Sequence, residues 1–339
     1  MSRHRQRWLG GLLLGVLWLL PTAVQARPSV WARARDPQGE KQRETIRTAE
    51  RLLLKSEQEE GGLSPQMAQL YLTQARLLYE MAGVKTSTDP FLRTRYAGIL
   101  QELGDYEATT HELEAILRLS PPAPVRSEVY RDLAVCYARL DRHDEEIRAY
   151  GEALALEPHA GPRSLLLSNR AEAFMAIGDI TQAVAGYRAS LALLGTREMF
   201  SHGVTTLWGL SVGLDRSGDL ESALENIRLA RTYDPRDMRI NGPGWFYVPS
   251  YDVHWYKALG HWQSARAAET GAARVQFFGD AVASWQAYLD SAPTEDSWAP
   301  LARVRLAQCE REREDAIRRS LKVRTSAKPP PARPRGKTP

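Results

Sequence analysis

The chain has 339 residues, of which 43% are hydrophobic and 25% charged, and its net charge at pH 7 is +4. This composition excludes a disordered chain and is sufficient for a large buried core. The two cysteines, Cys136 and Cys309, are too few for a disulfide scaffold, so we expect buried free thiols rather than an intramolecular bridge.

Residues 1–26 have the features of a signal peptide. Three arginines precede an apolar run from Leu9 to Leu20, and Ala23 and Ala26 are small residues of the kind found before a cleavage point. The run is shorter than the roughly 20 residues of a transmembrane helix, and an uncleaved anchor is the alternative. No other stretch has a transmembrane pattern. We therefore expect an exported protein without a transmembrane segment, either periplasmic or secreted.

The next segments are a polar, flexible lead-in at residues 27–40 and an N-terminal helical hairpin at 41–89. Apolar residues recur at helical spacing in both helices of this hairpin. A Gly-Gly pair at 61–62 ends the first helix. Ser64-Pro65 begins the second, with a capping serine followed by proline at the first helical position.

Residues 90–237 repeat one pattern four times, around turns that are 37, 37 and 40 residues apart. A small residue stands seven positions before each turn and a large apolar residue four before it, and mostly apolar or small residues stand five, nine and twelve after it. Such a period predicts stacked helical hairpins. The predicted turn residues are Gly104, Asp141, Gly178 and Gly218.

This pattern resembles the tetratricopeptide repeat family, although the period exceeds the usual length of about 34 residues and Glu146 occupies a position where a small residue is usual. The resemblance implies an all-α solenoid of about six hairpins with a C-terminal capping helix. It also implies that the concave face, lined by the first helix of each repeat, binds a peptide or partner protein. The residues placed on that face are Glu128, Arg131, Arg139, Glu172, Trp208, Asp215 and Arg216; for Arg131 and Arg139 the alternative is ordinary surface charge. The Lys and Asn pairing with which the family grips a C-terminal carboxylate does not appear, so we reject that mode.

The C-terminal third is less regular. Residues 238–253 form an aromatic-rich insert in which Trp245 and Tyr247 are candidate partner contacts, the alternative being that the insert fills a gap on the solenoid. Residues 254–322 are interpreted as a degraded repeat around Gly260, a lone helix and a capping helix. Residues 323–339 are expected to be a disordered basic tail, because the stretch 316–339 contains eight Lys or Arg and no acid.

The sequence contains no recognisable catalytic, cofactor-binding or metal-binding motif. His254 and His261 share one helical face, but a metal site would need a third ligand. The leading hypothesis is a non-enzymatic protein-protein interaction scaffold of the cell envelope or extracellular space, and nucleic acid is not an expected partner. The alternative is a cell-wall or polysaccharide-binding protein that uses the aromatic insert for sugars and the basic tail for an anionic envelope polymer.

Overall fold

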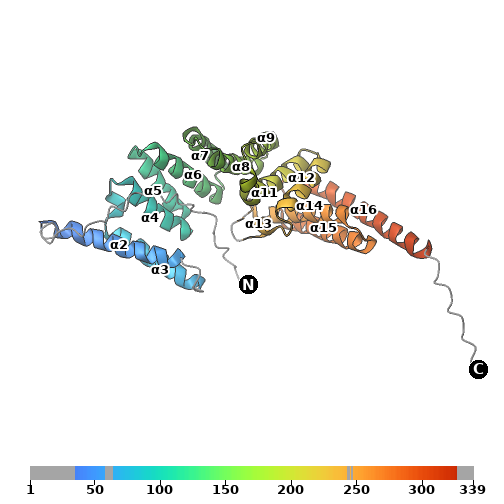
Figure 1. Ribbon diagram of the computed structural model, residues 1–339, viewed down its shortest axis with the longest axis horizontal. Coiled ribbons are helices and arrows are strands. Elements are labelled where there is room, and N and C mark those ends of the chain that lie inside the picture. Colours follow the sequence, from blue (N-terminus) through green and yellow to red (C-terminus); the bar gives the residue numbers. More distant parts are fainter. Residues whose placement is uncertain (1–34, 58–63, 243–244, 246, 327–339) are drawn as a thin grey trace, which may run out of the picture. The chain divides into compact units, whose positions relative to one another are not determined.

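The computed structural model describes residues 35–57, 64–242, 245 and 247–326, and its regular structure in this part is helical throughout (Figure 1). The predicted signal peptide, the start of the lead-in and most of the basic tail lie outside the described residues. None of the helices in the described ranges combines the length and apolar character that crossing a bilayer requires.

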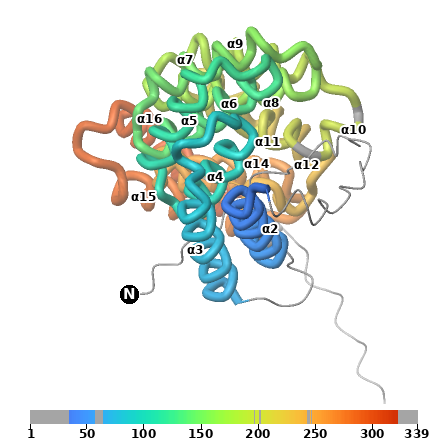
Figure 2. The backbone as a smooth tube through the Cα atoms, turned by 90° about the vertical axis from the view of Figure 1, so that its left-hand side faces the viewer, coloured from blue at the N-terminus to red at the C-terminus, as the bar shows by residue number. Residues whose placement is uncertain are grey.

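The chain divides into two compact units, of which unit 1 comprises residues 1–202 and 239–245. The described part of unit 1 contains four antiparallel helical hairpins, and each one packs on the next in chain order (Figures 1 and 2). Short connecting elements are η2 (Val84–Thr86), α10 (Thr196–Glu198), η3 (Met199–Gly203) and α13 (Met238–Asn241). The hairpins are α2 (Pro37–Glu57) with α3 (Pro65–Met81), α4 (Pro90–Glu102) with α5 (Tyr106–Arg118), α6 (Ala123–Arg139) with α7 (His143–Leu156), and α8 (Ala160–Ala176) with α9 (Ile180–Leu191).

Unit 2 comprises residues 203–238 and 246–339. Its described part contains two hairpins, a short η4 (Ser250–Asp252) and a long terminal helix that packs on α15. The helices are α11 (Val204–Arg216) with α12 (Leu220–Tyr233), α14 (Val253–Ala267) with α15 (Gly271–Ser291), and α16 (Ala299–Ser326). Six hairpins and a terminal helix in the described ranges confirm the predicted all-α, tetratricopeptide-like fold.

The turns follow directly from the residues that occupy them. All four predicted turn residues have positive φ: 77° at Gly104, 56° at Asp141, 81° at Gly178 and 96° at Gly218. Glycine adopts this conformation without steric cost, and aspartate tolerates it better than most residues. At the three glycine turns, the next residue is an aspartate whose side chain accepts a hydrogen bond from the first turn of the second helix. Each such cap is worth about 1 kcal/mol.

The repeat positions are the core of the hairpins. The small residues seven before the turns are at most 1% exposed, and those twelve after are fully buried. Glu146 stands five positions after its turn, where a small residue is usual. Its buried carboxylate is partly compensated by a neighbouring side chain, because His143 Nδ1 lies 2.9 Å from Glu146 Oε2. Phe174 is the one member of the large set that stays partly exposed.

The prediction for residues 254–322 is wrong in one respect, because Gly260 is not a turn. It lies within the continuous helix α14, and α15 is likewise continuous from Gly271, so the two form a full hairpin. A Cβ at position 260 would come within 3.0 Å of the Trp208 ring. The glycine therefore permits close packing of α14 against α11 rather than a change of direction. At the two ends, α2 begins inside the predicted lead-in and α16 extends past residue 322.

Candidate functional site

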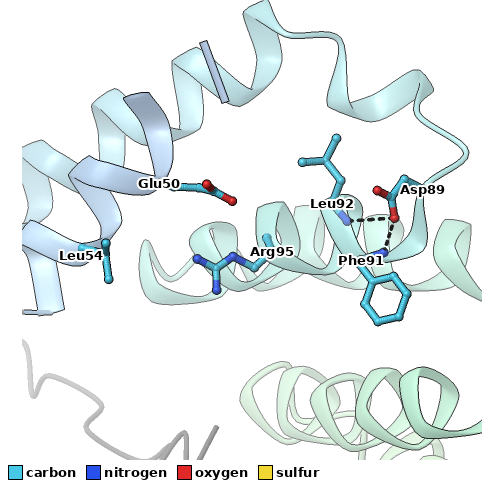
Figure 3. A pocket seen from close by; sticks show the side chains of 6 residues that line it. All are labelled: Glu50, Leu54, Asp89, Phe91, Leu92 and Arg95. Carbon is cyan, nitrogen blue, oxygen red and sulfur yellow. Dashed lines mark hydrogen bonds between the residues drawn. The ribbon is translucent and has the colours of Figure 1, made fainter. Parts of the chain in front are cut away.

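A groove of about 510 Å³ lies between α2 and α4, the first helices of the first two hairpins (Figure 3). Asp89 caps α4 by accepting hydrogen bonds from the Phe91 and Leu92 backbone N–H groups, at 2.9 and 3.4 Å. Phe91 is thereby fixed in the first helical turn, where its side chain is 62% exposed, and Leu54 of α2 is 55% exposed. Two apolar side chains are thus presented to solvent from neighbouring first helices.

The same groove contains an acid and a base, Glu50 of α2 and Arg95 of α4. Within the described ranges, no ion pair shorter than 4 Å involves either side chain. Both influence the buried hydroxyl of Tyr79, whose pKa is raised chiefly by burial and further by Glu50. The groove therefore offers apolar contact together with one charge of each sign, which suits a peptide side chain better than it suits bond-making chemistry.

On α6, the structure places two of the residues predicted from the repeats together. Arg131 contacts Asp132 at 3.0 Å and Glu128 at 3.5 Å, and the Arg131 and Glu128 side chains are each 43% exposed. Arg139 instead packs over the ring of Tyr106 on α5, 5.8 Å from its centroid, and burial lowers the pKa of its guanidinium. Arg131 is thus accessible with its charge shared between two acids, whereas Arg139 belongs to the α5–α6 packing.

Glu172 on α8 is the predicted residue with the most unusual electrostatics. It is partly buried, and no described residue forms a hydrogen bond or an ion pair with it. Burial, and secondarily the nearby Glu146 of α7, raise the pKa of Glu172 to about 8. Near neutral pH this carboxyl is therefore largely protonated, and a cation placed beside it would favour the ionised form.

The prediction that Trp208, Asp215 and Arg216 line an accessible face is wrong. Trp208 is 1% exposed and stacks on Tyr256, and Asp215 is fully buried. These α11 side chains are covered within unit 2 by α14 and α16. A repeat pattern treats each hairpin as equivalent, so it could not reveal that the last elements of unit 2 close over α11.

The covered side chains form a buried charge network. Arg305 Nε donates to Asp215 Oδ1 at 2.7 Å, and Trp255 Nε1 donates to Asp215 Oδ2 at 2.9 Å. Arg216 pairs with Asp252 at 2.8 Å and lies 4.7 Å from the Trp255 ring centroid. Each of these side chains has at least one hydrogen-bond partner, although the buried Arg216 Nε has none in the part of the chain that the structure describes. The network is therefore structural and not an open binding site.

The aromatic insert is divided between the two units, and Tyr247 and Tyr251 pack within unit 2. Tyr247 meets Tyr256 edge to face at 5.0 Å, and the Tyr251 hydroxyl donates to Asp296 at 2.8 Å. Trp245 is partly buried. Because both tyrosines contact residues of the protein itself, the arrangement favours the interpretation that the insert fills a gap on the solenoid over the interpretation that it contacts a partner. Among the described residues, no group of three His, Cys, Asp or Glu side chains could hold a metal ion.

The two cysteines are free thiols, each buried in a different unit. Burial raises the pKa of Cys136 to about 12 and that of Cys309 further still. Both thiols are therefore protonated and unreactive under ordinary conditions.

No family model and no curated protein matches the sequence. Among solved structures, the MamA protein has 12% identity and a TM-score of 0.46, covering 59% of this chain and 94% of that chain. The C-terminal part of a TPR repeat-containing protein from Cytophaga hutchinsonii has 11% identity and a TM-score of 0.48, covering 84% and 96%. The P58(IPK) TPR domain has 12% identity and a TM-score of 0.38, covering 84% and 69%.

Proposed function

We propose that this protein is a non-catalytic scaffold that binds a peptide segment or partner protein along the first helices of unit 1, α2, α4, α6 and α8. The observation that carries the proposal is the α2–α4 groove, where Leu54 and Phe91 are more than half exposed beside Glu50 and Arg95. Exposed apolar side chains beside charges that form no ion pair with the described residues are suited to anchor a partner protein.

The charges further along unit 1 support a partner that carries basic side chains. Glu128 and Asp132 outnumber Arg131 on α6, and Glu172 on α8 has no partner among the described residues. A lysine or arginine of the partner beside Glu172 would remove the cost of ionising it. Binding of such a partner should therefore release more protons at pH 7 than at pH 9, because the carboxyl is already ionised at pH 9.

The cell envelope or the extracellular space is the proposed setting, on the strength of the signal-peptide features of residues 1–26. Cell fractionation followed by mass spectrometry of the mature N-terminus tests this part. A mature chain that begins near residue 27 in the exported fraction supports it, and an intact N-terminus in the cytosol refutes it.

Site-specific photo-crosslinking tests the binding face. The photoreactive amino acid benzoyl-phenylalanine replaces Phe91 in one variant and Phe200 in the matched control, since Phe200 is 53% exposed in the same unit but lies in η3, outside helices α2, α4, α6 and α8. We expect a discrete cross-linked product at position 91 and little at position 200. Equal labelling at both positions contradicts the proposal.

A synthetic peptide from the cross-linked segment then measures affinity by fluorescence anisotropy. The double variant Leu54→Ala/Phe91→Ala should weaken binding at least tenfold, because truncation of two apolar anchors typically costs more than 1 kcal/mol each. Leu229→Ala, an exposed leucine of unit 2, is the control and should leave the affinity unchanged.

A further inference from the structure

Helix α3 exposes an apolar stripe that the described part of unit 1 does not cover. Its members are Met67, Leu70, Leu77 and Met81, which are 42%, 47%, 53% and 78% exposed. With Gln74 they recur at intervals of three and four residues, so they form one straight seam on the helix. The opposite face of α3 is the one that packs within unit 1, through Ala68, Ala75 and Tyr79.

The stripe carries no charge. The two charged residues of α3 point elsewhere: Arg76 pairs with Glu80 at 3.3 Å, and Glu80 accepts a hydrogen bond from Tyr96 of α4 at 2.6 Å. The second helices of the other hairpins differ, because α5, α7, α9, α12 and α15 together expose a single large apolar side chain, Leu229. The exposed face of α7, for example, presents Asp144, Arg148 and Glu152.

The position of α3 makes this difference informative. The hairpin α2–α3 is the first of the stack in the described part of unit 1, as Figure 2 shows. The terminal hairpins of repeat proteins ordinarily have polar outer surfaces that maintain solubility. An apolar seam at such a place favours a surface that is covered in the working protein.

We propose that the occupant is α3 of a second copy of this chain, packed antiparallel about Gln74. The seam is almost symmetric about that residue, with apolar members seven and four positions before it and three and seven after it. An antiparallel pair would set Met67 against Met81 and Leu70 against Leu77 of the other copy. A self-complementary pattern of this kind is what a two-fold interface requires.

Gln74 fits the centre of such an interface. A carboxamide donates and accepts hydrogen bonds at once, so two copies of Gln74 satisfy each other across the axis. A single polar pair in an apolar seam also fixes the register. Two helices of 17 residues, each about 25 Å long, make a smaller contact than the roughly 1,200 Å² of a standard interface. We therefore expect a weak dimer that dissociates in roughly the micromolar range.

Cysteine cross-linking of the full chain tests the register. Gln74→Cys places two thiols at the axis, and mild oxidation should give a covalent dimer. Met67→Cys and Met81→Cys alone should give none, because their copies lie about 20 Å apart, whereas a mixture of the two variants should cross-link. The unmodified chain is the background control, because Cys136 and Cys309 are buried.

Sedimentation equilibrium from about 1 to 200 μM, a range set by the expected affinity, tests the interface itself. The unmodified chain should show concentration-dependent dimers, and Leu70→Glu/Leu77→Glu should remain monomeric with an unchanged helical circular dichroism spectrum. The matched control Gln38→Glu/Gln69→Glu adds the same charge at exposed positions off the seam and should still dimerise.

Three results would overturn the proposal. One is a chain that stays monomeric throughout this range and does not cross-link through Gln74→Cys, in which case residues 27–34 or another protein cover the seam. The second is equal cross-linking by all three single cysteines, which indicates a parallel or random association. The third is dimerisation that survives the Leu70→Glu/Leu77→Glu change.

Discussion

Replacing Glu172 by glutamine should stabilise unit 1 in a pH-dependent manner. The pKa of this carboxyl rises from an ordinary value of 4.5 to about 8 on folding. Between these two values the unfolded chain releases the proton while the folded chain keeps it. Folding stability therefore decreases as the pH rises through this window and is constant above it. Glutamine has a similar shape and carries no charge, so it removes the effect.

The size of the effect follows from the same two values. The rise in the pKa of Glu172 corresponds to at most about 5 kcal/mol of unfolding free energy, since each tenfold change in the acid dissociation constant is about 1.4 kcal/mol. Part of the side chain remains in contact with water, so we expect a smaller gain of about 1 to 3 kcal/mol at pH 9. At pH 4 the carboxyl is mostly protonated in both states, so the gain should fall to about 0.2 kcal/mol.

Urea unfolding of the two chains at pH 4, 7 and 9 measures this difference. The control is Glu152→Gln on α7, which makes the same substitution at an exposed position. A gain for Glu172→Gln that does not change with pH, or that is larger at pH 4 than at pH 9, refutes the assignment of a buried, uncompensated carboxyl.

Four further substitutions, three of glycine and one of aspartate, test the packing. Gly178→Ala should destabilise the chain by about 1 to 2 kcal/mol because φ is +81° there, whereas Gly151→Ala, in open space within α7, should stabilise it by about 0.5 to 1 kcal/mol; thermal unfolding of both variants distinguishes the two signs. Gly260→Ala should cost about 1 to 3 kcal/mol, since its Cβ would lie 3.0 Å from the Trp208 ring, and a neutral result in a thermal melt would show that α14 is not held there. Asp215→Ala leaves Arg305 buried without its partner and should cost about 3 to 5 kcal/mol. In a denaturant series, the double variant with Arg305→Ala should cost much less than the sum of the single changes, and strict additivity would contradict the pairing.

The features that could be predicted from the sequence are those set by residues close together in the chain. The turn at Gly178 followed by the cap at Asp179 depends on neighbouring residues, and the burial of Ala171 and Ala183 depends on helical spacing about that turn. The role of Gly260 could not be predicted, because a glycine that admits an indole from another hairpin is indistinguishable in sequence from one that ends a helix.

The candidate site was only partly predictable. Arg131 and Glu172 occupy first-helix positions that follow from the repeat. The groove itself was missed, because it depends on the lateral fit of α2 against α4, and α2 lies outside the repeats. The Asp89-Pro90 pair marks the start of α4 in the sequence. Phe91 follows this pair directly, and its place in the first helical turn was the signal for an exposed aromatic side chain.

The contact between Asp215 and Arg305 joins residues 90 positions apart, at opposite ends of unit 2. During synthesis, α11 leaves the ribosome long before α16, so its carboxylate has no guanidinium to meet until nearly the whole unit has been translated. A repeat array normally gains stability one hairpin at a time. We expect unit 2 instead to gain a large part of its stability only on completion, so that a chain truncated before α16 is degraded faster by proteases than the full chain.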